Sequence, residues 1–204
     1  MTQFVVKPFL DEISKMKFRE KVMGELVGIV PRKLDVSTLL DVVRKYADIM
    51  MHTMERYFVL EDTMEITDKI AQDVMKNVMK YAKILKKGPE NYEARAEIMW
   101  CGSLSHNGLT GCGTCGGDWA THLIEHELGG MFDVAHGAGL AAVWGSWARY
   151  VMDEKPERFA QFAVDVMGVE ESDDVKSTAL KGIEAVEEFY RMIEMPTNMK
   201  ELGI

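Results

Sequence analysis

The chain has 204 residues with 24 basic and 33 acidic side chains, so its formal net charge is −9. With 47% apolar and 28% charged residues, it has the composition of a globular protein rather than of a disordered or collagen-like one. The acidic balance, without any block of like charges, argues against a nucleic-acid partner held through its phosphates. No run of about 18 apolar residues occurs, which argues against a membrane-spanning helix. No secretory signal is visible at the N-terminus.

Cysteine usage favours a reducing compartment. Three cysteines are an odd number, and they accompany 16 methionines, a combination that suits a reducing interior better than an oxidising exterior. A cytoplasmic protein is therefore expected. Cys112 and Cys115 form a C-x-x-C spacing. Without a second cysteine pair, a structural zinc site is not expected. The preferred interpretation is that these two cysteines are simply small residues in a loop, and a redox pair is the alternative.

Helical periodicity dominates the chain. Helices are predicted in four stretches, from apolar residues at steps of three and four or from flanking proline and glycine: Glu61–Leu85, Glu90–His106, Asp153–Met167 and Val175–Ile193. Pro89 is expected near the start of the second stretch, and Ser172 is the expected N-cap before the last. Long helices with short connections predict an all-α, bundle-like domain over residues 35–204.

Two stretches are not predicted to form helices of this bundle. Residues 1–34 are of mixed composition and are expected to form an N-terminal arm or one appended helix. Residues 108–117, GLTGCGTCGG, hold five glycines in ten positions and predict a loop. Gly111, Gly113 and Gly116 match G-x-G-x-x-G, but a helix rather than a strand precedes them, so a dinucleotide-binding turn is not expected.

Histidines and one aspartate carry the chemical signal. Asp48 and His52 are four residues apart in ADIMMHTMERYF, which reads as helix. Their carboxylate and imidazole therefore lie on one face, one turn apart. His122 and His126 have the same spacing in DWATHLIEHELGGMF. Two polar pairs of this kind predict a site where the helices meet.

A third segment adds His136 in DVAHGAGLAAV. Gly137 and Gly139 are expected to let the backbone bend there, so that the ring returns toward the preceding helix. One carboxylate and three imidazoles are sufficient to bind a divalent transition metal. Nitrogen and oxygen donors without thiolate favour iron(II), zinc, nickel or manganese.

The stretch ARAEIMWCGSLSHNGL…DWATHLIEHELGGMFDVAHGAGLAAVWGSWARYV, from Ala94 to Val151, resembles the C-terminal helical domain of iron-containing alcohol dehydrogenases. It is most similar to the butanol dehydrogenase-like branch, which ADIMMHTMERYF also resembles, and the likeness covers roughly residues 46–204. This resemblance implies that the metal ligands are Asp48, His52, His122 and His136. It also implies that His126 lies beside the metal without being a ligand.

The resemblance implies an NAD- or NADP-dependent alcohol dehydrogenase or aldehyde reductase. A divalent metal, iron by preference with zinc or nickel as alternatives, would polarise the oxygen of a small alcohol or aldehyde for hydride exchange. His126 would act in catalysis by relaying the proton, because imidazole titrates near neutral pH, and a packing role is the alternative.

The family's N-terminal α/β nucleotide-binding domain is expected to be absent, so that the chain is a truncated or split member. A homo-oligomer or a separate nucleotide-binding polypeptide is the expected partner, and an inactive isolated chain is one expected outcome.

Two further interpretations stay open. His122, Glu125 and His126 satisfy H-x-x-E-H, a zinc-peptidase motif in which the histidines bind zinc and the glutamate activates water. On that hypothesis Glu125→Gln abolishes activity. On the dehydrogenase hypothesis it changes little, whereas Asp48→Asn or His136→Ala removes the metal. The third interpretation is a non-catalytic helical metal-binding fragment, marked by an exposed apolar face where a partner packs.

Overall fold

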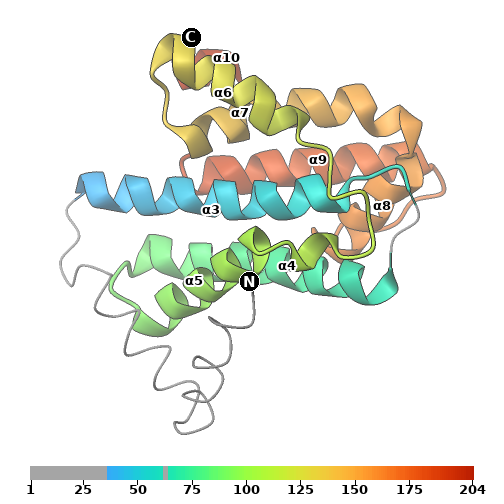
Figure 1. Ribbon diagram of the computed structural model, residues 1–204, viewed down its shortest axis with the longest axis horizontal. Coiled ribbons are helices and arrows are strands. Elements are labelled where there is room, and N and C mark those ends of the chain that lie inside the picture. The colour runs from blue at the N-terminus through green and yellow to red at the C-terminus, as the bar shows by residue number, and fades with distance from the viewer. Residues whose placement is uncertain (1–35, 62–63) are drawn as a thin grey trace, which may run out of the picture. The chain divides into compact units, whose positions relative to one another are not determined.

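The computed structural model describes residues 36–61 and 64–204, with side chains from Lys45 onward, and the arm or helix expected within residues 1–34 lies outside them. In these residues the regular structure is helical and contains no strand. The helices are α3 (Val36–Tyr57), α4 (Glu65–Lys87), α5 (Tyr92–His106), η1 (Leu109–Gly111), α6 (Ala120–Phe132), α7 (His136–Val151), η2 (Met152–Glu154), α8 (Pro156–Asp165), α9 (Val175–Met192) and α10 (Met199–Leu202) (Figure 1). The all-α prediction is confirmed. Among the described helices, none is long and apolar enough to cross a membrane.

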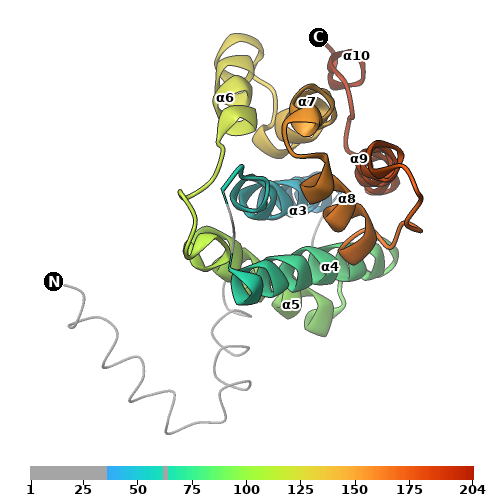
Figure 2. The ribbon, with the colours of Figure 1, turned by 90° about the vertical axis from the view of Figure 1, so that its right-hand side faces the viewer.

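Helix α3 forms the centre of the unit Val36–Ile204. It contacts α4, α5 and α7. Figure 2, which looks nearly along α3, shows α4 and α5 on one side of it and α6 and α7 on the other. Helices α8 and α9 pack against each other, and α9 also contacts α7. Side chains that leave α3 in different directions therefore meet different neighbouring helices.

Methionine fills much of the space around α3. Met50, Met51 and Met54 of α3 are completely buried, as are Met75 of α4 and Trp144 of α7. The unbranched thioether side chain adapts to irregular gaps between helices. The polar residues of α3 that are buried in this apolar environment, such as Glu55, therefore need a polar partner.

The predicted helices are present, but two of their N-terminal caps differ from expectation. Helix α5 begins later than predicted, because the side chain of Asn91 caps it by accepting the backbone N–H of Ala94 at 2.9 Å. Helix α9 is capped by Asp174, whose side chain accepts the backbone N–H of Lys176 at 3.2 Å. The prediction of Ser172 as this cap is wrong, because the carboxylate of Asp174 lies nearer to the first turn.

A buried arginine fixes the C-terminal end of α3. Nε of Arg158 in α8 donates to the backbone oxygen of Tyr57 at 3.0 Å, one of the last carbonyls of α3. The guanidinium also binds both carboxylate oxygens of Asp68 in α4, at 2.6 and 2.7 Å. The end of α3 is thus held between α4 and α8.

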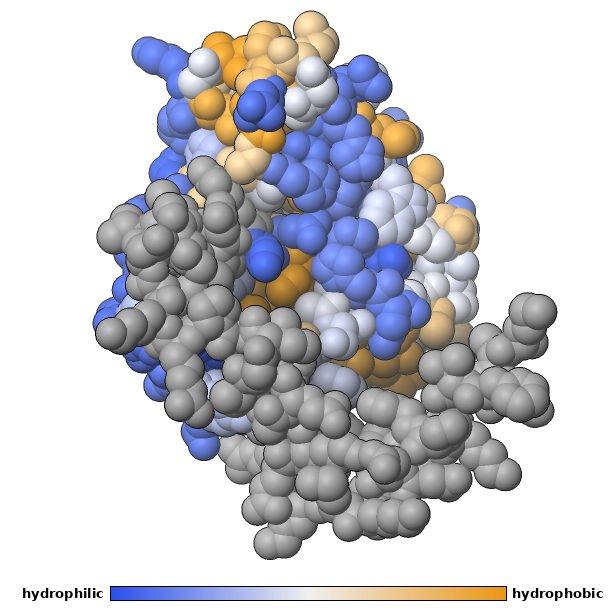
Figure 3. All heavy atoms as spheres, turned by 60° about the vertical axis from the view of Figure 1, so that its left-hand side comes forward, coloured by the Kyte–Doolittle hydropathy of each residue, from blue (hydrophilic) through white to orange (hydrophobic). Residues whose placement is uncertain are grey.

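Helix α6 exposes several apolar side chains. Leu123 and Met131 are 65% and 72% exposed, and Ile124 and Phe132 are also exposed. Figure 3 shows apolar surface gathered at its upper end, which is the end of the domain where α6 and α10 lie. Several exposed apolar residues on one short helix are typical of an interaction surface. The expected apolar face is therefore present on α6.

Candidate metal centre

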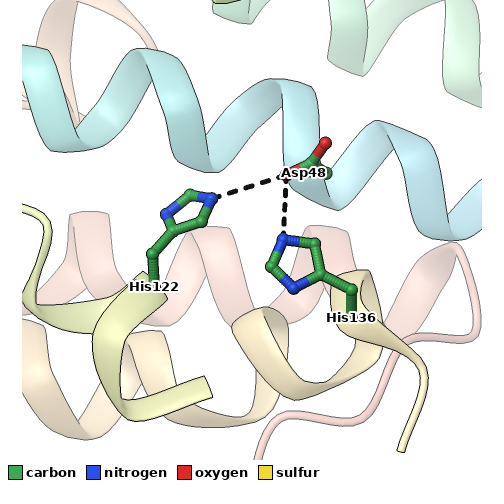
Figure 4. Close-up of side chains that lie close together, drawn as sticks. All are labelled: Asp48, His122 and His136. Atoms are coloured by element: carbon green, nitrogen blue, oxygen red, sulfur yellow. Dashed lines mark ion pairs between the residues drawn. The ribbon is translucent and has the colours of Figure 1, made fainter. Parts of the chain in front are cut away.

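Asp48 lies where histidines from three helices meet. It precedes His52 by one turn of α3, and Oδ1 of Asp48 is 3.6 Å from Nε2 of His52. Nε2 of His122 in α6 is 3.5 Å from the same oxygen, and Nε2 of His136, the first residue of α7, is 3.4 Å from it (Figure 4). The structure therefore brings together the four residues for which metal ligation was predicted.

The spacing and burial of these atoms fit a divalent cation. Ligand atoms about 2.1 Å from an ion are roughly 3.4 Å apart when they are arranged tetrahedrally. The distances from Oδ1 of Asp48 to His122 and His136 match this separation. Oδ1 of Asp48 and Nε2 of His122 are also buried without a hydrogen-bond partner among the described residues. Because unpaired buried polar atoms are costly, this donor set fits a bound cation.

Two buried glutamates orient two of these histidines, a role that was not predicted from the sequence. Oε2 of Glu55 contacts Nδ1 of His122, and Oε1 accepts the backbone N–H of the same residue at 3.1 Å. Glu125 contacts Nδ1 of His136 in the same way. An ionised carboxylate only accepts hydrogen bonds, so each Nδ1 carries a hydrogen and each Nε2 is the ring nitrogen directed toward Asp48. Carboxylates of this kind orient the rings of metal-binding histidines.

Helix spacing was a usable signal for Glu55. It lies seven residues after Asp48 and three after His52, so the three side chains share one face of α3. Its relative exposure is 0%. A glutamate is almost never completely buried unless it is paired. Because it shares a face with Asp48 and His52, Glu55 could therefore have been recognised as a partner of the site.

The chain turns back between α6 and α7 at a different place from the one predicted. Gly137 and Gly139 lie inside α7 and do not bend it. The reversal occurs before them, where Asp133 ends α6 in the left-handed conformation with φ 54°. Gly139 is needed for packing instead, because a Cβ there would lie 2.7 Å from Cγ of Glu125. Its small size lets Glu125 pass between the two helices to reach His136.

The predicted loop over residues 108–117 is present except for the short 3-10 helix η1, and it sets the start of α6. Gly117 has φ 113°, and a Cβ at this position would lie 2.8 Å from the backbone oxygen of Glu55. The backbone N–H of Asp118 donates to that same oxygen at 2.9 Å. The loop is therefore docked against α3 beside Glu55, which fixes where the first turn of α6 begins.

The clustered charges shift one another's pKa. Burial raises the pKa of Asp48, but the nearby imidazoles, that of His122 foremost, outweigh burial and lower it from 3.8 to about 2. Burial lowers the pKa of His122, yet the neighbouring carboxylates of Asp48 and Glu55 raise it from 6.5 to about 9. For His52, burial and repulsion from His106 lower the pKa from 6.5 to about 4. At neutral pH, and without an ion, His122 is protonated and His52 is neutral.

His126 lies beside the cluster and is exposed. Its ring stacks on that of His136 with centroids 5.5 Å apart, and it is 6.1 Å from the ring of His122. Glu125 is 2% exposed and bound to His136, so it does not face a site between His122 and His126. This geometry does not support the zinc-peptidase hypothesis drawn from H-x-x-E-H.

A further histidine, not assigned by the sequence analysis, ends α5. Nε2 of His106 is 3.3 Å from Oδ2 of Asp48, and its ring centroid is 4.0 Å from that of His52. Donor atoms of Asp48, His52 and His106 lie within 4.8 Å of one another. This histidine has no ionisable residue three or four positions before it in α5, so helix spacing gave no signal for it.

Comparison with known proteins identifies the family. Residues 43–204 match the model for the C-terminal domain of the Fe-containing alcohol dehydrogenase family. The chain is 35% identical over 159 residues to the NADH-dependent butanol dehydrogenase A of Clostridium acetobutylicum. It is 32% identical over 158 residues to the NADPH-dependent aldehyde reductase YqhD of Escherichia coli. These matches cover 78% and 77% of this chain but only 41% and 40% of the relatives.

Solved structures agree with the sequence matches. The substrate- and cofactor-free form of the Escherichia coli aldehyde reductase YqhD has a TM-score of 0.79 at 28% identity, covering 85% of this chain and 44% of that protein. The NADH-dependent butanol dehydrogenase A of Thermotoga maritima has a TM-score of 0.76 at 37% identity, covering 79% of this chain and 40% of that protein. The predicted resemblance is confirmed: the chain belongs to the Fe-containing alcohol dehydrogenase family and corresponds to its C-terminal helical domain.

Proposed function

We propose that this chain is the metal-binding half of an alcohol dehydrogenase or aldehyde reductase, with residues 35–204 as the metal-binding domain. The observation that carries the proposal is the approach of His52, His122 and His136 to Oδ1 of Asp48 at 3.4–3.6 Å. These four residues would hold the ion. A donor set without thiolate favours iron(II), with zinc or nickel as alternatives, and the family is named for iron. When bound, such a metal supplies a Lewis acid for the oxygen of an alcohol or aldehyde.

The neighbouring side chains would divide the remaining tasks. Glu55 and Glu125 would hold the rings of His122 and His136 with Nε2 directed at the site, as their contacts with Nδ1 support. His126 would accept the hydroxyl proton of an alcohol during oxidation and return it during reduction. Its exposure and its position on the ring of His136 support this role.

The hydride acceptor would be NAD or NADP, because one relative is named NADH-dependent and another NADPH-dependent. The chain spans about two-fifths of the length of these relatives. The apolar face of α6, where Leu123 and Met131 are 65% and 72% exposed, would bind a second copy of this chain or a nucleotide-binding polypeptide. The odd number of cysteines supports a reducing compartment, the cytoplasm, as the place of action.

Aldehyde reduction tests this function. The chain is purified anaerobically, loaded with Fe²⁺ and assayed with butanal and NADH or NADPH. Turnover is expected to require the metal and to fall at least about a hundredfold in His136→Ala, which removes a donor. Glu127→Gln, on the exposed side of the same helix as Glu125, serves as the control. Turnover that is unaffected by removal of the metal or by His136→Ala would contradict the proposal, whereas a chain that binds the metal but reduces no aldehyde with either nucleotide would be a metal-binding fragment that lacks the nucleotide site.

Metal affinity is expected to rise with pH. The raised pKa of His122, about 9, means that the metal-free ring is protonated at pH 7 and must lose the proton from Nε2 when a metal binds. His52, with a pKa lowered to about 4, is already neutral. The apparent affinity for Zn²⁺ should therefore increase about tenfold per pH unit between pH 7 and 8.5 and level off near pH 9. Calorimetric titrations at several pH values measure it, and a flat profile over this range would contradict the assignment.

A further inference from the structure

We infer that His106 is an additional donor to the divalent metal at Asp48, beyond the four ligands that the family resemblance implies. This inference rests on the proposed metal site. Nε2 of His106 is 3.3 Å from Oδ2 of Asp48, the carboxylate oxygen opposite the one that His122 and His136 approach. Asp48 therefore has an imidazole nitrogen close to each of its two oxygens.

The hydrogen bonds of His106 determine which ring nitrogen carries the hydrogen. Nδ1 is 2.9 Å from the backbone oxygen of Gly102, which can only accept. Oγ of Ser105, 2.7 Å from the same Nδ1, donates its own hydrogen to the Gly102 oxygen at 3.0 Å. Nδ1 is therefore the donor, and a neutral ring has a bare lone pair at Nε2. Nε2 and Oδ2 of Asp48 lie within hydrogen-bond distance, at 3.3 Å, and a cation between them would take the place of the hydrogen that they otherwise share.

His106 shares this arrangement with the best-oriented histidines of the site. His122 and His136 also have Nδ1 bound to an acceptor and Nε2 aimed at Asp48. His52 differs, because its Nδ1 is buried without a hydrogen-bond partner among the described residues. A hydrogen bond at Nδ1 fixes the tautomer and ring direction that coordination through Nε2 needs. By this criterion His106 is better prepared to coordinate than His52.

The end of α5 that carries His106 is anchored to α3. Nη1 of Arg56 donates to the backbone oxygen of Ser105 at 2.7 Å and to that of His52 at 2.9 Å. The same guanidinium lies 4.7 Å from the ring centroid of Trp119. His106 and His52 are thus held by one arginine, which keeps the two rings beside each other. A fifth protein donor would favour an ion that accepts five or six ligands over zinc, which prefers four.

Cobalt(II) binding tests this inference without relying on activity. Each imidazole bound to Co²⁺ gives its own set of strongly shifted ring-proton signals in the NMR spectrum. The wild-type chain is expected to bind one equivalent of Co²⁺ and to show such sets for four histidines. His106→Ala should still bind one equivalent of Co²⁺, but its affinity should be at least about tenfold weaker, and one set of shifted ring-proton signals should disappear. His106→Asn provides a second variant with a polar side chain, and Ser103→Ala, at an exposed position of the same helix, is the control that keeps wild-type affinity. Because the His106 side chain is 42% exposed, these substitutions should leave the fold intact, which circular dichroism verifies.

Two results would overturn the inference. Unchanged affinity and unchanged shifted signals in His106→Ala would mean that a proton, rather than the metal, lies between His106 and Asp48. A second equivalent of Co²⁺ that disappears in His106→Ala would mean a separate site instead of one ion with five donors. The proposed function fails differently: it is contradicted if His122→Ala binds Co²⁺ as tightly as the wild-type chain, whatever His106 does.

Discussion

Replacing Asp48 with alanine is expected to abolish divalent-metal binding by this chain. Every imidazole of the cluster has its Nε2 within 3.3–3.6 Å of an Asp48 oxygen. The substitution therefore removes both the shared donor and the only carboxylate that faces the ion among the residues proposed as ligands. Histidine rings alone would leave the full charge of the ion without a negative partner. The loss should exceed the roughly 10- to 100-fold reduction that follows removal of an outer partner of a ligand.

Calorimetric titration with Zn²⁺ or Co²⁺ measures this loss. Asp48→Asn separates charge from shape, because the amide has the size of the carboxylate and one acceptor oxygen but no negative charge. We expect it to bind metal far more weakly than the wild type as well. Asp73→Ala is the matched control, since this exposed aspartate of α4 pairs with Lys76 at the surface. If Asp48→Ala bound one equivalent with wild-type affinity, the ion would have to lie elsewhere and the proposed site would be abandoned.

Most of the fold could be predicted from the spacing of apolar residues. The steps of three and four that predicted helices reflect burial of one face, and α4, α8 and α9 bury those faces. Helix starts were harder to predict, because they depend on which side chain reaches a free N–H. Asn91 caps α5 although a proline two residues earlier could also have begun a helix.

The candidate site was predictable only in part. Spacing placed Asp48 beside His52 and predicted a metal site of one carboxylate and three imidazoles. Which of the histidines are ligands came only from the family resemblance, because spacing does not show which rings approach the same oxygen. Contacts between separate helices left no local pattern for His106. Glu125 was considered as part of a peptidase motif because the pattern H-x-x-E-H can be read directly from the sequence. Its contact with His136 joins two helices across the α6–α7 turn and leaves no such pattern.

Replacing Glu55 with alanine is expected to weaken both the fold and metal binding. Glu55 is completely buried and accepts both Nδ1–H and the backbone N–H of His122. Its removal leaves these donors unsatisfied and the buried imidazole of His122 without one of its two carboxylates. Breaking a buried ion pair in this way typically costs about 3–5 kcal/mol of unfolding free energy. Loss of the ring's orienting partner should also weaken metal affinity roughly 10- to 100-fold.

Glu55→Gln distinguishes the two effects within one residue. Its amide oxygen can still accept the backbone N–H of His122, so most of the folding stability should remain. Its amide NH₂ group, however, would oppose Nδ1–H and favour the ring tautomer with the hydrogen on Nε2, the atom that faces Asp48. Metal affinity should therefore fall nearly as far as in Glu55→Ala while stability does not. Urea unfolding followed by circular dichroism, together with calorimetric titration, measures the two quantities, with Glu127→Gln on the surface of α6 as the control. Equal losses of stability in Glu55→Ala and Glu55→Gln, with unchanged metal affinity in both, would show that Glu55 only supports packing and does not orient His122 toward the ion.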